Sequence, residues 1–370
     1  MPHRMLAIIA CLMISGSAMA ADLKIGVVSP MTGATATFGQ ENTNGIKLAY
    51  EKLKKAPGKK FDLIIEDDKS EAIESTNATR KLLSVDKVSV MIGAPTSSLA
   101  LASAPIVQEA KIPFITPTAT NAKVTMVGDY ITRACFTDDF QGVVMAKFAV
   151  NTLKKTKGLI LVETTSDYSK GLAKAFGDEF AKLGGKMASS EELTYSAKDT
   201  DFQSILRKVK RANPDFIFIP GYYVEAGLIV KQARALGINV PFLGGDGWDS
   251  PKLFEIAGEA VKGSYISNHF APDDKSPVVQ NFVKEYEKAY GVKPGSFAAL
   301  GYDSLGIVAD AIKRAKSTKP ADIRAALVAT KGYQGITGTI TFDKDRNPTK
   351  SAVVLEATPS GYVFHSRVNP

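Results

Sequence analysis

Short apolar runs alternate with amphipathic segments along the first third of the chain. Four of these runs have the length of a strand and lie at residues 23–28, 61–65, 88–92 and 113–116. The segments between them carry apolar residues at three- and four-residue spacing, as Ile46, Tyr50 and Leu53 do, which is typical of an amphipathic helix. Strand, loop and helix repeated in this order predict a parallel sheet covered by helices.

The same alternation returns further along, so we expect a second lobe of the same kind. Its strand-like runs are 158–162, 216–219, 242–243 and 264–267. The C-terminal part then holds helical segments around 282–290 and 298–315 and strand-like runs at 338–342 and 352–356. The pattern therefore predicts the α/β fold class, with two doubly wound parallel-sheet lobes.

The first twenty residues have the layout of a secretory signal. Arg4 precedes an apolar run over 5–14, and small residues close the segment at 18–20. We therefore expect a signal peptide over 1–20, cleavage before Ala21 and a periplasmic location. The alternatives are a buried N-terminal helix and lipoprotein cleavage at Cys11, which would leave almost no apolar core upstream. No later stretch approaches the roughly twenty apolar residues of a transmembrane helix.

Cysteine usage and charge narrow the possible partners. Once Cys11 leaves with the signal, Cys135 has no partner within the chain, and we interpret it as an inert buried thiol. The 46 basic and 38 acidic residues give a formal charge of +8. Lysines over 52–60 alternate with apolar residues, which is typical of a solvated helix face and not of a nucleic-acid groove. We expect no nucleic-acid partner.

The sequence lacks the common catalytic motifs. It contains no Walker A loop, no G-x-S-x-G elbow, no G-x-G-x-x-G and no H-E-x-x-H. His3, His269 and His365 are scattered, and the acidic turn 343–347 lacks the glycine and terminal Glu of a calcium loop. We therefore expect no enzymatic activity, no cofactor and no metal.

Polar loops follow the predicted strands, where open α/β sheets bind ligands. They span 93–98, 115–120, 163–168, 220–222 and 244–248. Ser97 or Ser98 is expected to cap a helix, whose free N–H groups suit a carboxylate, although such residues also cap and turn without binding anything. Asp246 lies in a glycine-rich loop and would pair with a cation. Anion donors in one lobe and an acid in the other fit a zwitterion.

Several of these segments together resemble the leucine/isoleucine/valine-binding proteins, which are type I periplasmic binding proteins of ABC transporters. The segments that carry the resemblance are 24–33, 92–120, 167–172, 221–237 and 244–250. The resemblance spans essentially the whole mature chain. It implies a hinge with three crossings, which places 21–138 plus 271–341 in lobe 1 and 139–270 plus 342–370 in lobe 2.

The resemblance also implies a ligand site. The ligand carboxylate would meet Ser97 and Thr120, and its ammonium would meet the Thr118 carbonyl and Asp246. The remaining implied residues are aromatic. Tyr168 and Tyr222 would close over the ligand, and Phe38 and Phe297 would form the walls of its side-chain pocket. This sequence departs from the best-known members at Asp246, where they carry Glu, and at Thr96, where some relatives have a half-cystine.

The function implied is that of a monomeric binding protein. It would capture a branched-chain or other aliphatic amino acid by lobe closure and deliver it to an ABC transporter permease. Relatives that bind aromatic acids or amides keep much of the same framework, so such a ligand is the main alternative. A ligand sensor and an exported α/β hydrolase are further alternatives, and the hydrolase would need a nucleophile aligned with a histidine.

Overall fold

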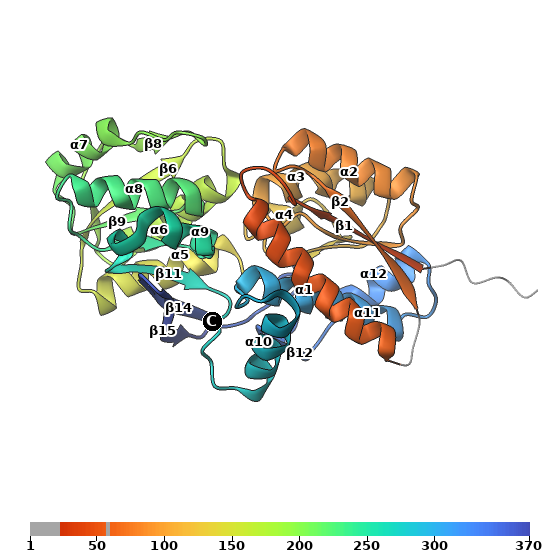
Figure 1. Ribbon diagram of the computed structural model, residues 1–370. Helices are drawn as coiled ribbons and strands as arrows, with labels where there is room; N and C mark the ends of the chain where they lie inside the picture. The colour runs from red at the N-terminus through yellow and green to blue at the C-terminus, as the bar shows by residue number, and fades with distance from the viewer. Residues whose placement is uncertain (1–22, 57–59) are drawn as a thin grey trace, which may run out of the picture.

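A computed structural model describes residues 23–56 and 60–370, which form two α/β lobes lying next to each other (Figure 1). The expected signal peptide over 1–20 lies outside the described residues. In the described ranges, no helix is both long and apolar enough to cross a membrane.

The first lobe is built on a five-stranded parallel sheet in the order β2-β1-β3-β4-β5. Its strands are β1 (Leu23–Ser29), β2 (Phe61–Asp67), β3 (Val90–Gly93), β4 (Phe114–Thr116) and β5 (Ile131–Arg133). All residues of β1 except Lys24 are buried, as expected of a central strand covered on both faces. The first four strands match the predicted runs, whereas β5 was not predicted, because a single apolar residue, Ile131, is followed by Thr132 and Arg133.

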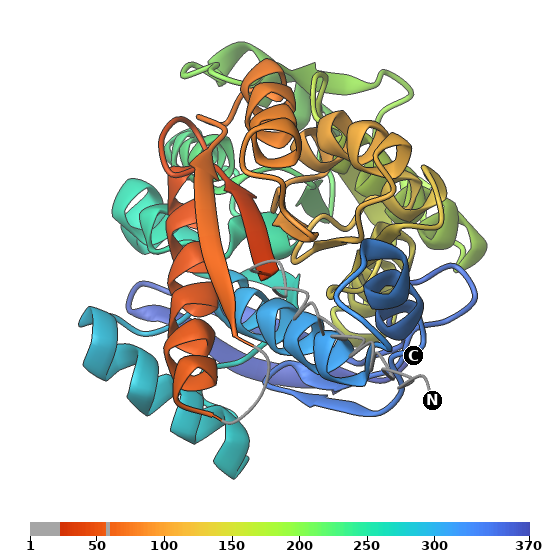
Figure 2. The same ribbon diagram turned by 90° about the vertical axis from the view of Figure 1, so that its right-hand side faces the viewer.

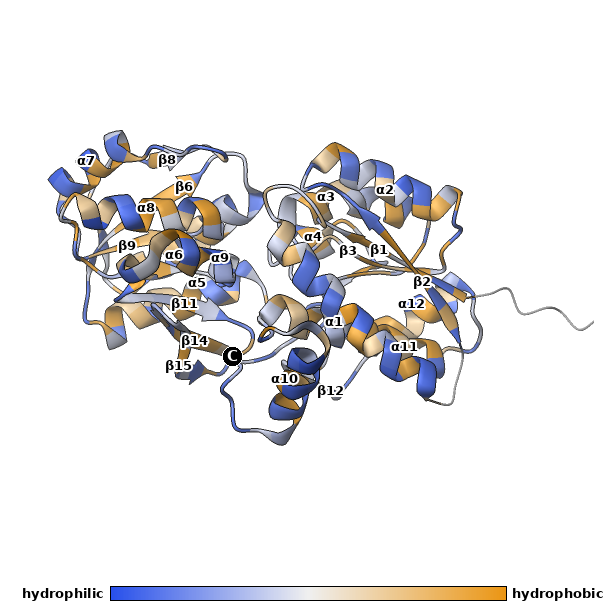
Figure 3. Ribbon diagram, in the orientation of Figure 1, coloured by the Kyte–Doolittle hydropathy of each residue, from blue (hydrophilic) through white to orange (hydrophobic). Residues whose placement is uncertain are grey.

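Helices cover both faces of this sheet. On one face lie α2 (Ala72–Ser84) and α3 (Ser97–Glu109), and the short α4 (Lys123–Met126) adds Val124 to their apolar cluster. On the other face lie α1 (Ala36–Lys55), α11 (Ser296–Arg314) and α12 (Pro320–Val328). The apolar sides of these helices face the strands and their polar sides face outward (Figure 3). Helix α10 (Pro277–Tyr290) packs beside α1 and α11.

Two glycines bring α1 and α11 into backbone contact (Figure 2). A Cβ on Gly45 would lie 1.9 Å from the carbonyl oxygen of Ala298, and one on Gly301 would lie 2.3 Å from that of Asn42. Any larger residue would force the helices apart. This close packing sets Phe38 of α1 against Phe297 of α11, where the two rings stack with centroids 4.0 Å apart.

The second lobe holds a mixed sheet in the order β15-β14-β11-β10-β9-β6-β7, with β8 beside β6. Its parallel strands are β6 (Lys157–Glu163), β7 (Lys186–Met187), β8 (Leu193–Tyr195), β9 (Phe216–Ile219), β10 (Phe242–Gly244) and β11 (Ser264–Asn268). The last two strands, β14 (Ala352–Thr358) and β15 (Gly361–Val368), are antiparallel. The parallel strands predicted for this sheet are confirmed. Strands β14 and β15 extend it as an antiparallel hairpin, which a two-residue turn at 359–360 closes.

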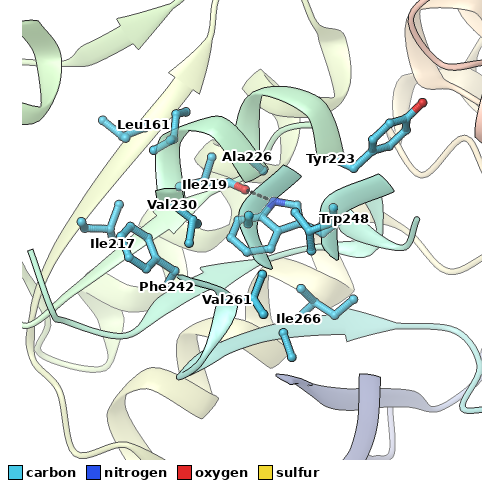
Figure 4. Close-up of a cluster of buried hydrophobic side chains, with 14 of the residues drawn as sticks. Leu161, Ile217, Ile219, Tyr223, Ala226, Val230, Phe242, Trp248, Val261 and Ile266 are labelled. Atoms are coloured by element: carbon cyan, nitrogen blue, oxygen red, sulfur yellow. Dashed lines mark hydrogen bonds between the residues drawn. The ribbon is translucent and has the colours of Figure 1, made fainter. Parts of the chain in front are cut away.

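Helices also cover both faces of the second sheet. One face carries α5 (Asp138–Lys147), continued by a π-helical turn (Phe148–Thr152), and α6 (Asp167–Lys182). The other carries α7 (Gln203–Ala212), α8 (Tyr223–Ala235), α9 (Pro251–Ala257) and the 3₁₀ turns η2 (Asp246–Trp248) and η3 (Gly258–Val261). In the core beneath α8, the indole Nε1 of Trp248 donates a 3.0 Å hydrogen bond to the Ile219 carbonyl (Figure 4). This bond fixes the η2 turn to the end of β9.

The chain passes between the two sheets three times. It leaves the first sheet after β5, returns after β11 to build α10, α11 and α12, and leaves again to form β14. Just before the last passage, β12 (Tyr333–Gly335) and β13 (Gly338–Ile340) form a separate two-stranded hairpin. The predicted strand at 338–342 therefore belongs to neither large sheet.

Candidate ligand-binding site

A small cavity of about 10 Å³ lies between the lobes, at the carboxyl ends of β3, β4, β6, β9 and β10. Its walls are Pro95, Thr96, Ser97, Thr118, Tyr168, Tyr222, Asp246, Gly247 and Phe297. Two of the residues proposed from the sequence are not in this lining. Phe38 lies behind Phe297, and Thr120 is buried beside the cavity with its carbonyl oxygen accepting from the Asp138 N–H at 2.9 Å.

The start of α3 supplies the wall of the first lobe. The N-cap is Thr96, so the expectation that Ser97 or Ser98 caps this helix is wrong by one or two positions. Ser97 instead accepts a 3.2 Å hydrogen bond from the N–H of Asn121, which ties the β3–α3 loop to the loop after β4. The N–H groups of the first turn have no partner within the helix, and the positive end of its dipole lies at the cavity.

A buried arginine holds the loop after β4 in shape. Arg133, at the end of β5, donates to the carbonyl oxygens of Ala119 and Asn121 at 2.8 Å each. Thr118 adds a 2.6 Å hydrogen bond from its hydroxyl to the Pro95 carbonyl, joining this loop to the one that precedes α3. The sequence analysis missed Arg133, whose only local sign is a basic residue at the end of a short apolar run.

Cys135 lies beside the same loop. Its thiol donates to the Ala119 carbonyl at 3.4 Å, and burial raises its pKa to about 12. A thiol with that pKa does not form a thiolate at neutral pH.

Asp246 supplies the wall of the second lobe and is held by three side chains. Its Oδ1 accepts from the hydroxyl of Tyr168 at 2.9 Å and from Nε2 of Gln141 at 3.1 Å. Its Oδ2 lies 3.0 Å from Nε2 of His269. The Tyr168 oxygen in turn accepts from the N–H of Gly247 at 3.1 Å. Gln141 and His269 come from α5 and from the segment after β11, and the sequence analysis missed both.

Burial sets the protonation of the groups around Asp246. It raises the pKa of Asp138 to about 7, with the nearby charge of Asp246 acting in the same direction. Burial lowers the pKa of His269 below its ordinary value, although the hydrogen bond to Asp246 opposes this shift. His269 is therefore neutral at pH 7, and Asp246 faces the cavity with neutral partners only.

Aromatic rings complete the cavity. Tyr168 and Tyr222 stack with ring centroids 5.3 Å apart. Phe38 and Tyr222 meet edge to face, with ring centroids 5.7 Å apart. Beyond them lies the Phe38–Phe297 stack. One end of the cavity is thus polar and the other is apolar, as is typical of a site for a small amphiphilic ligand.

Direct contacts between the lobes close the cavity. Ser98 at the start of α3 donates to Oδ2 of Asp167 at 2.9 Å and accepts from the Asp167 N–H at 3.0 Å. Asn121 donates to the Asp167 carbonyl at 2.7 Å. Tyr223 of α8 donates to the Ala34 carbonyl at 3.0 Å. A ligand inside would be shielded from water.

Two carboxylates meet at the start of α11. Asp249, just after η2, accepts from the N–H of Ser296 at 2.7 Å and from Nδ2 of Asn268 at 2.9 Å. A Cβ on Gly295 would lie 2.6 Å from Oε2 of Glu41 and 3.2 Å from Oδ2 of Asp249, so both carboxylates crowd this glycine. Burial, reinforced by the charge of Asp249, raises the pKa of Glu41 well above its ordinary value.

Known proteins share this architecture along nearly the whole chain. The family model described as periplasmic binding protein matches residues 22–361. A leucine binding protein, LivK, from Thermotoga maritima has a TM-score of 0.91 and 38% identity, with 94% of this chain and 99% of that chain covered.

Two further solved structures are complexes with ligands. The branched-chain amino acid transporter substrate binding protein LivJ from Streptococcus pneumoniae, in complex with isoleucine, has a TM-score of 0.88 and 34% identity over 94% of this chain and all of that chain. A solute binding protein of an ABC transporter from Rhodopseudomonas palustris, in complex with 3,4-dihydroxybenzoic acid, has a TM-score of 0.83 and 26% identity over 94% and 97%. These relatives are substrate-binding proteins of transporters and not enzymes. The chain therefore belongs to the periplasmic binding protein family and is of the type to which the leucine- and isoleucine-binding proteins belong.

Proposed function

We propose that this protein captures a branched-chain or other aliphatic amino acid between its lobes and delivers it to the permease of an ABC transporter. The single observation that carries the proposal is the cavity itself. In this cavity the start of α3 faces Asp246, and the Phe38–Phe297 stack lies at the apolar end. A zwitterion with an apolar side chain matches all three features. The isoleucine bound by the relative from Streptococcus pneumoniae supports the same ligand class.

In this proposal the lobe of the first sheet holds the ligand carboxylate. The N–H groups at the start of α3, together with the Ser97 hydroxyl, donate to it. The ammonium then lies between the Thr118 carbonyl and Asp246, and Tyr168 and Tyr222 cover the ligand. Each hydrogen bond to a charged group contributes roughly 1.5–3 kcal/mol. Exclusion of water strengthens these interactions, because the local dielectric constant falls.

We also propose the arrangement that makes capture and release possible. The two lobes, 21–138 plus 271–341 and 139–270 plus 342–370, move about the three passages between the sheets. The protein acts as a monomer in the periplasm after the signal peptide over 1–20 is removed. The permease binds the closed form preferentially, so the presence of ligand is communicated by the shape of the protein.

A second candidate ligand is an aromatic acid. The relative from Rhodopseudomonas palustris in complex with 3,4-dihydroxybenzoic acid favours this class, and the phenylalanine stack could receive an aromatic ring. Such an acid lacks the ammonium that Asp246 would meet. The two candidate ligands therefore differ in whether they can pair with the carboxylate of Asp246.

Calorimetry on ligand-free protein tests the proposal. Mature protein, unfolded in denaturant, dialysed and refolded, is titrated with leucine, isoleucine, valine, benzoate and 3,4-dihydroxybenzoate. We expect micromolar or tighter binding of at least one of the three amino acids and none of the aromatic acids. Binding of an aromatic acid alone would replace the first candidate with the second, and binding of none of the five ligands would overturn both.

A further inference from the structure

We propose that His269 determines the charge at the ammonium end of the cavity and thereby the selectivity for ligands that carry an α-ammonium group. The inference rests on the proposed function, because it concerns the same cavity. It adds a residue that contacts Asp246 from outside the lining and assigns it a role in ligand selection.

The geometry around the imidazole favours its neutral form. Nε2 lies 3.0 Å from Oδ2 of Asp246, and the side chain of His269 is fully buried. Nδ1 is also buried and has no hydrogen-bond partner among the described residues. A neutral ring with its proton on Nε2 donates to Asp246 and leaves only an acceptor unpaired. An imidazolium would bury a second N–H without an acceptor, which costs free energy.

Charged groups reach this imidazole from three elements. Asp246 and Asp249, in and just after the η2 turn, favour a proton on His269. Lys350, from the segment before β14, disfavours it. Asp138 of α5 is joined to Asp246 through Gln141, which donates to both carboxylates. Phe136 stacks on the ring with centroids 3.6 Å apart and keeps water from its face.

The protonation of His269 decides which ligand the cavity prefers. With a neutral imidazole, Asp246 presents an unbalanced negative charge, and the ammonium of an amino acid balances it. With an imidazolium, Asp246 already has a cationic partner, and a second cation beside it gains little. A ligand of the same shape without the ammonium group would then fit better. The site should therefore select amino acids at neutral pH and lose this selectivity on acidification.

The test compares two ligands that differ only in the ammonium group. Leucine and 4-methylpentanoate, which is leucine without its amino group, are titrated into refolded protein at about pH 7.5 and about pH 5. For the wild type we expect the ratio of leucine affinity to 4-methylpentanoate affinity to fall at least about tenfold on acidification. A tenfold change in this ratio corresponds to roughly 1.4 kcal/mol, the free energy of a pKa shift of one unit.

Two variants separate His269 from other titrating groups. His269→Gln keeps an N–H donor near the position of Nε2 but does not take up a proton, so its affinity ratio should change less than about threefold between the two pH values. Asp138 still titrates in this variant, and a full wild-type response there would assign the effect to Asp138 and overturn the inference. His269→Leu removes the donor, and its leucine affinity at about pH 7.5 should fall roughly tenfold, as expected for one hydrogen bond to a charged group.

The outcomes also distinguish this inference from the proposed function. If the wild type binds no aliphatic amino acid at neutral pH, the proposed function fails. Two results would refute only the role of His269. Either His269→Leu binds leucine as tightly as the wild type does, or the wild type binds leucine with the same affinity ratio at both pH values. Circular dichroism and thermal unfolding of each variant verify that the fold is intact.

Discussion

Asp246 and Ser97 face the same cavity from opposite lobes, with different polar partners. Asp246 is surrounded by donors from Tyr168, Gln141 and His269, which fix both carboxylate oxygens in place. Ser97 accepts from the Asn121 N–H, so its own hydroxyl proton is free to be donated to a ligand. One residue is thus poised as an acceptor and the other as a donor. Their separate roles lead to a prediction for the pair.

We predict that Ser97→Ala combined with Asp246→Ala abolishes amino-acid binding and leaves the fold intact. Each substitution removes a hydrogen bond to a charged ligand group worth roughly 1.5–3 kcal/mol, so the pair should lower affinity by a factor between about a hundred and ten thousand. Calorimetry measures the loss and circular dichroism verifies the fold. Asp139→Asn, which changes an exposed carboxylate one residue beyond Asp138, is the matched control. Unchanged affinity in the double variant would refute the site assignment.

At the scale of single residues, the sequence predicted what lies in strand-end loops and missed what reaches the site from elsewhere. Ser97 and Asp246 were proposed from such loops, the family resemblance added Thr118 and the two tyrosines, and all of them line the cavity. Gln141 lies inside a helix, and His269 and Arg133 lie where the chain passes between the sheets. No local pattern marks these three residues, because only the tertiary fold brings them together.

Helices α3 and α6 meet end to end across the mouth of the cavity. Both begin at the carboxyl end of a strand, and Ser98 and Asp167 lie in their respective first turns. Asp167 is an acid at a helix start, where the dipole favours a negative charge, and it also accepts from the other lobe. The two helix starts therefore form a latch between the lobes.

We predict that Ser98→Ala speeds ligand release. The substitution removes a hydrogen bond to the Asp167 carboxylate that exists only while the lobes are closed. The dissociation rate should rise roughly tenfold with little change in the association rate. Stopped-flow measurements of ligand release give both rates. Ser84→Ala, at the exposed end of α2, is the control, and equal release rates in the two variants would exclude the latch.

The Glu41 and Asp249 pair at the start of α11 affects stability instead of binding. Because the pKa of Glu41 is raised in the folded chain, the folded state binds more protons than the unfolded state between the ordinary and the raised pKa. Stability therefore falls as pH rises through this window. Glu41→Gln removes the free-energy cost of ionising this side chain in the folded protein, since an amide has no proton to lose.

We predict that Glu41→Gln raises the unfolding temperature by about 1–2 °C at about pH 8, the shift expected for roughly 1 kcal/mol in a chain of this length. The difference should vanish at about pH 4, where Glu41 is protonated in both states. Thermal unfolding followed by circular dichroism gives the two curves. Glu51→Gln, exposed on the same helix, should show no such pH dependence. A variant less stable than the wild type at about pH 8 would contradict the prediction.

Elements differ in how readily the sequence reveals them. The central parallel strands are nearly continuous apolar runs, and for this reason β1, β6 and β9 were predicted. The edge strand β7 has only two exposed residues, and β15 is exposed or half-buried along its length. Such strands lack a run of buried residues, so no continuous hydrophobic pattern marks them.

At the scale of the whole molecule, the lobes enclose a cavity that is sealed by the latch and by the contact of Tyr223 with the first lobe. A ligand enters such a cavity only when the lobes separate. The closed arrangement is therefore the one expected to dominate with ligand bound.

We predict that ligand-free protein has a larger radius of gyration than the complex. Small-angle X-ray scattering on refolded protein, with and without saturating leucine, measures the difference. The same ligand should raise the unfolding temperature, because binding at one hundred times the dissociation constant stabilises the folded state by about 2.7 kcal/mol. Identical scattering in both samples would show that capture needs no closure.

The position of Trp248 gives this molecule an internal optical probe. It is the single tryptophan of the chain, it is fully buried, and it lies two residues from Asp246 in the η2 turn. Any shift of that turn on ligand capture alters the surroundings of one indole and of no other. The intensity or wavelength of its emission should therefore follow occupancy in real time, without a dye or an engineered label.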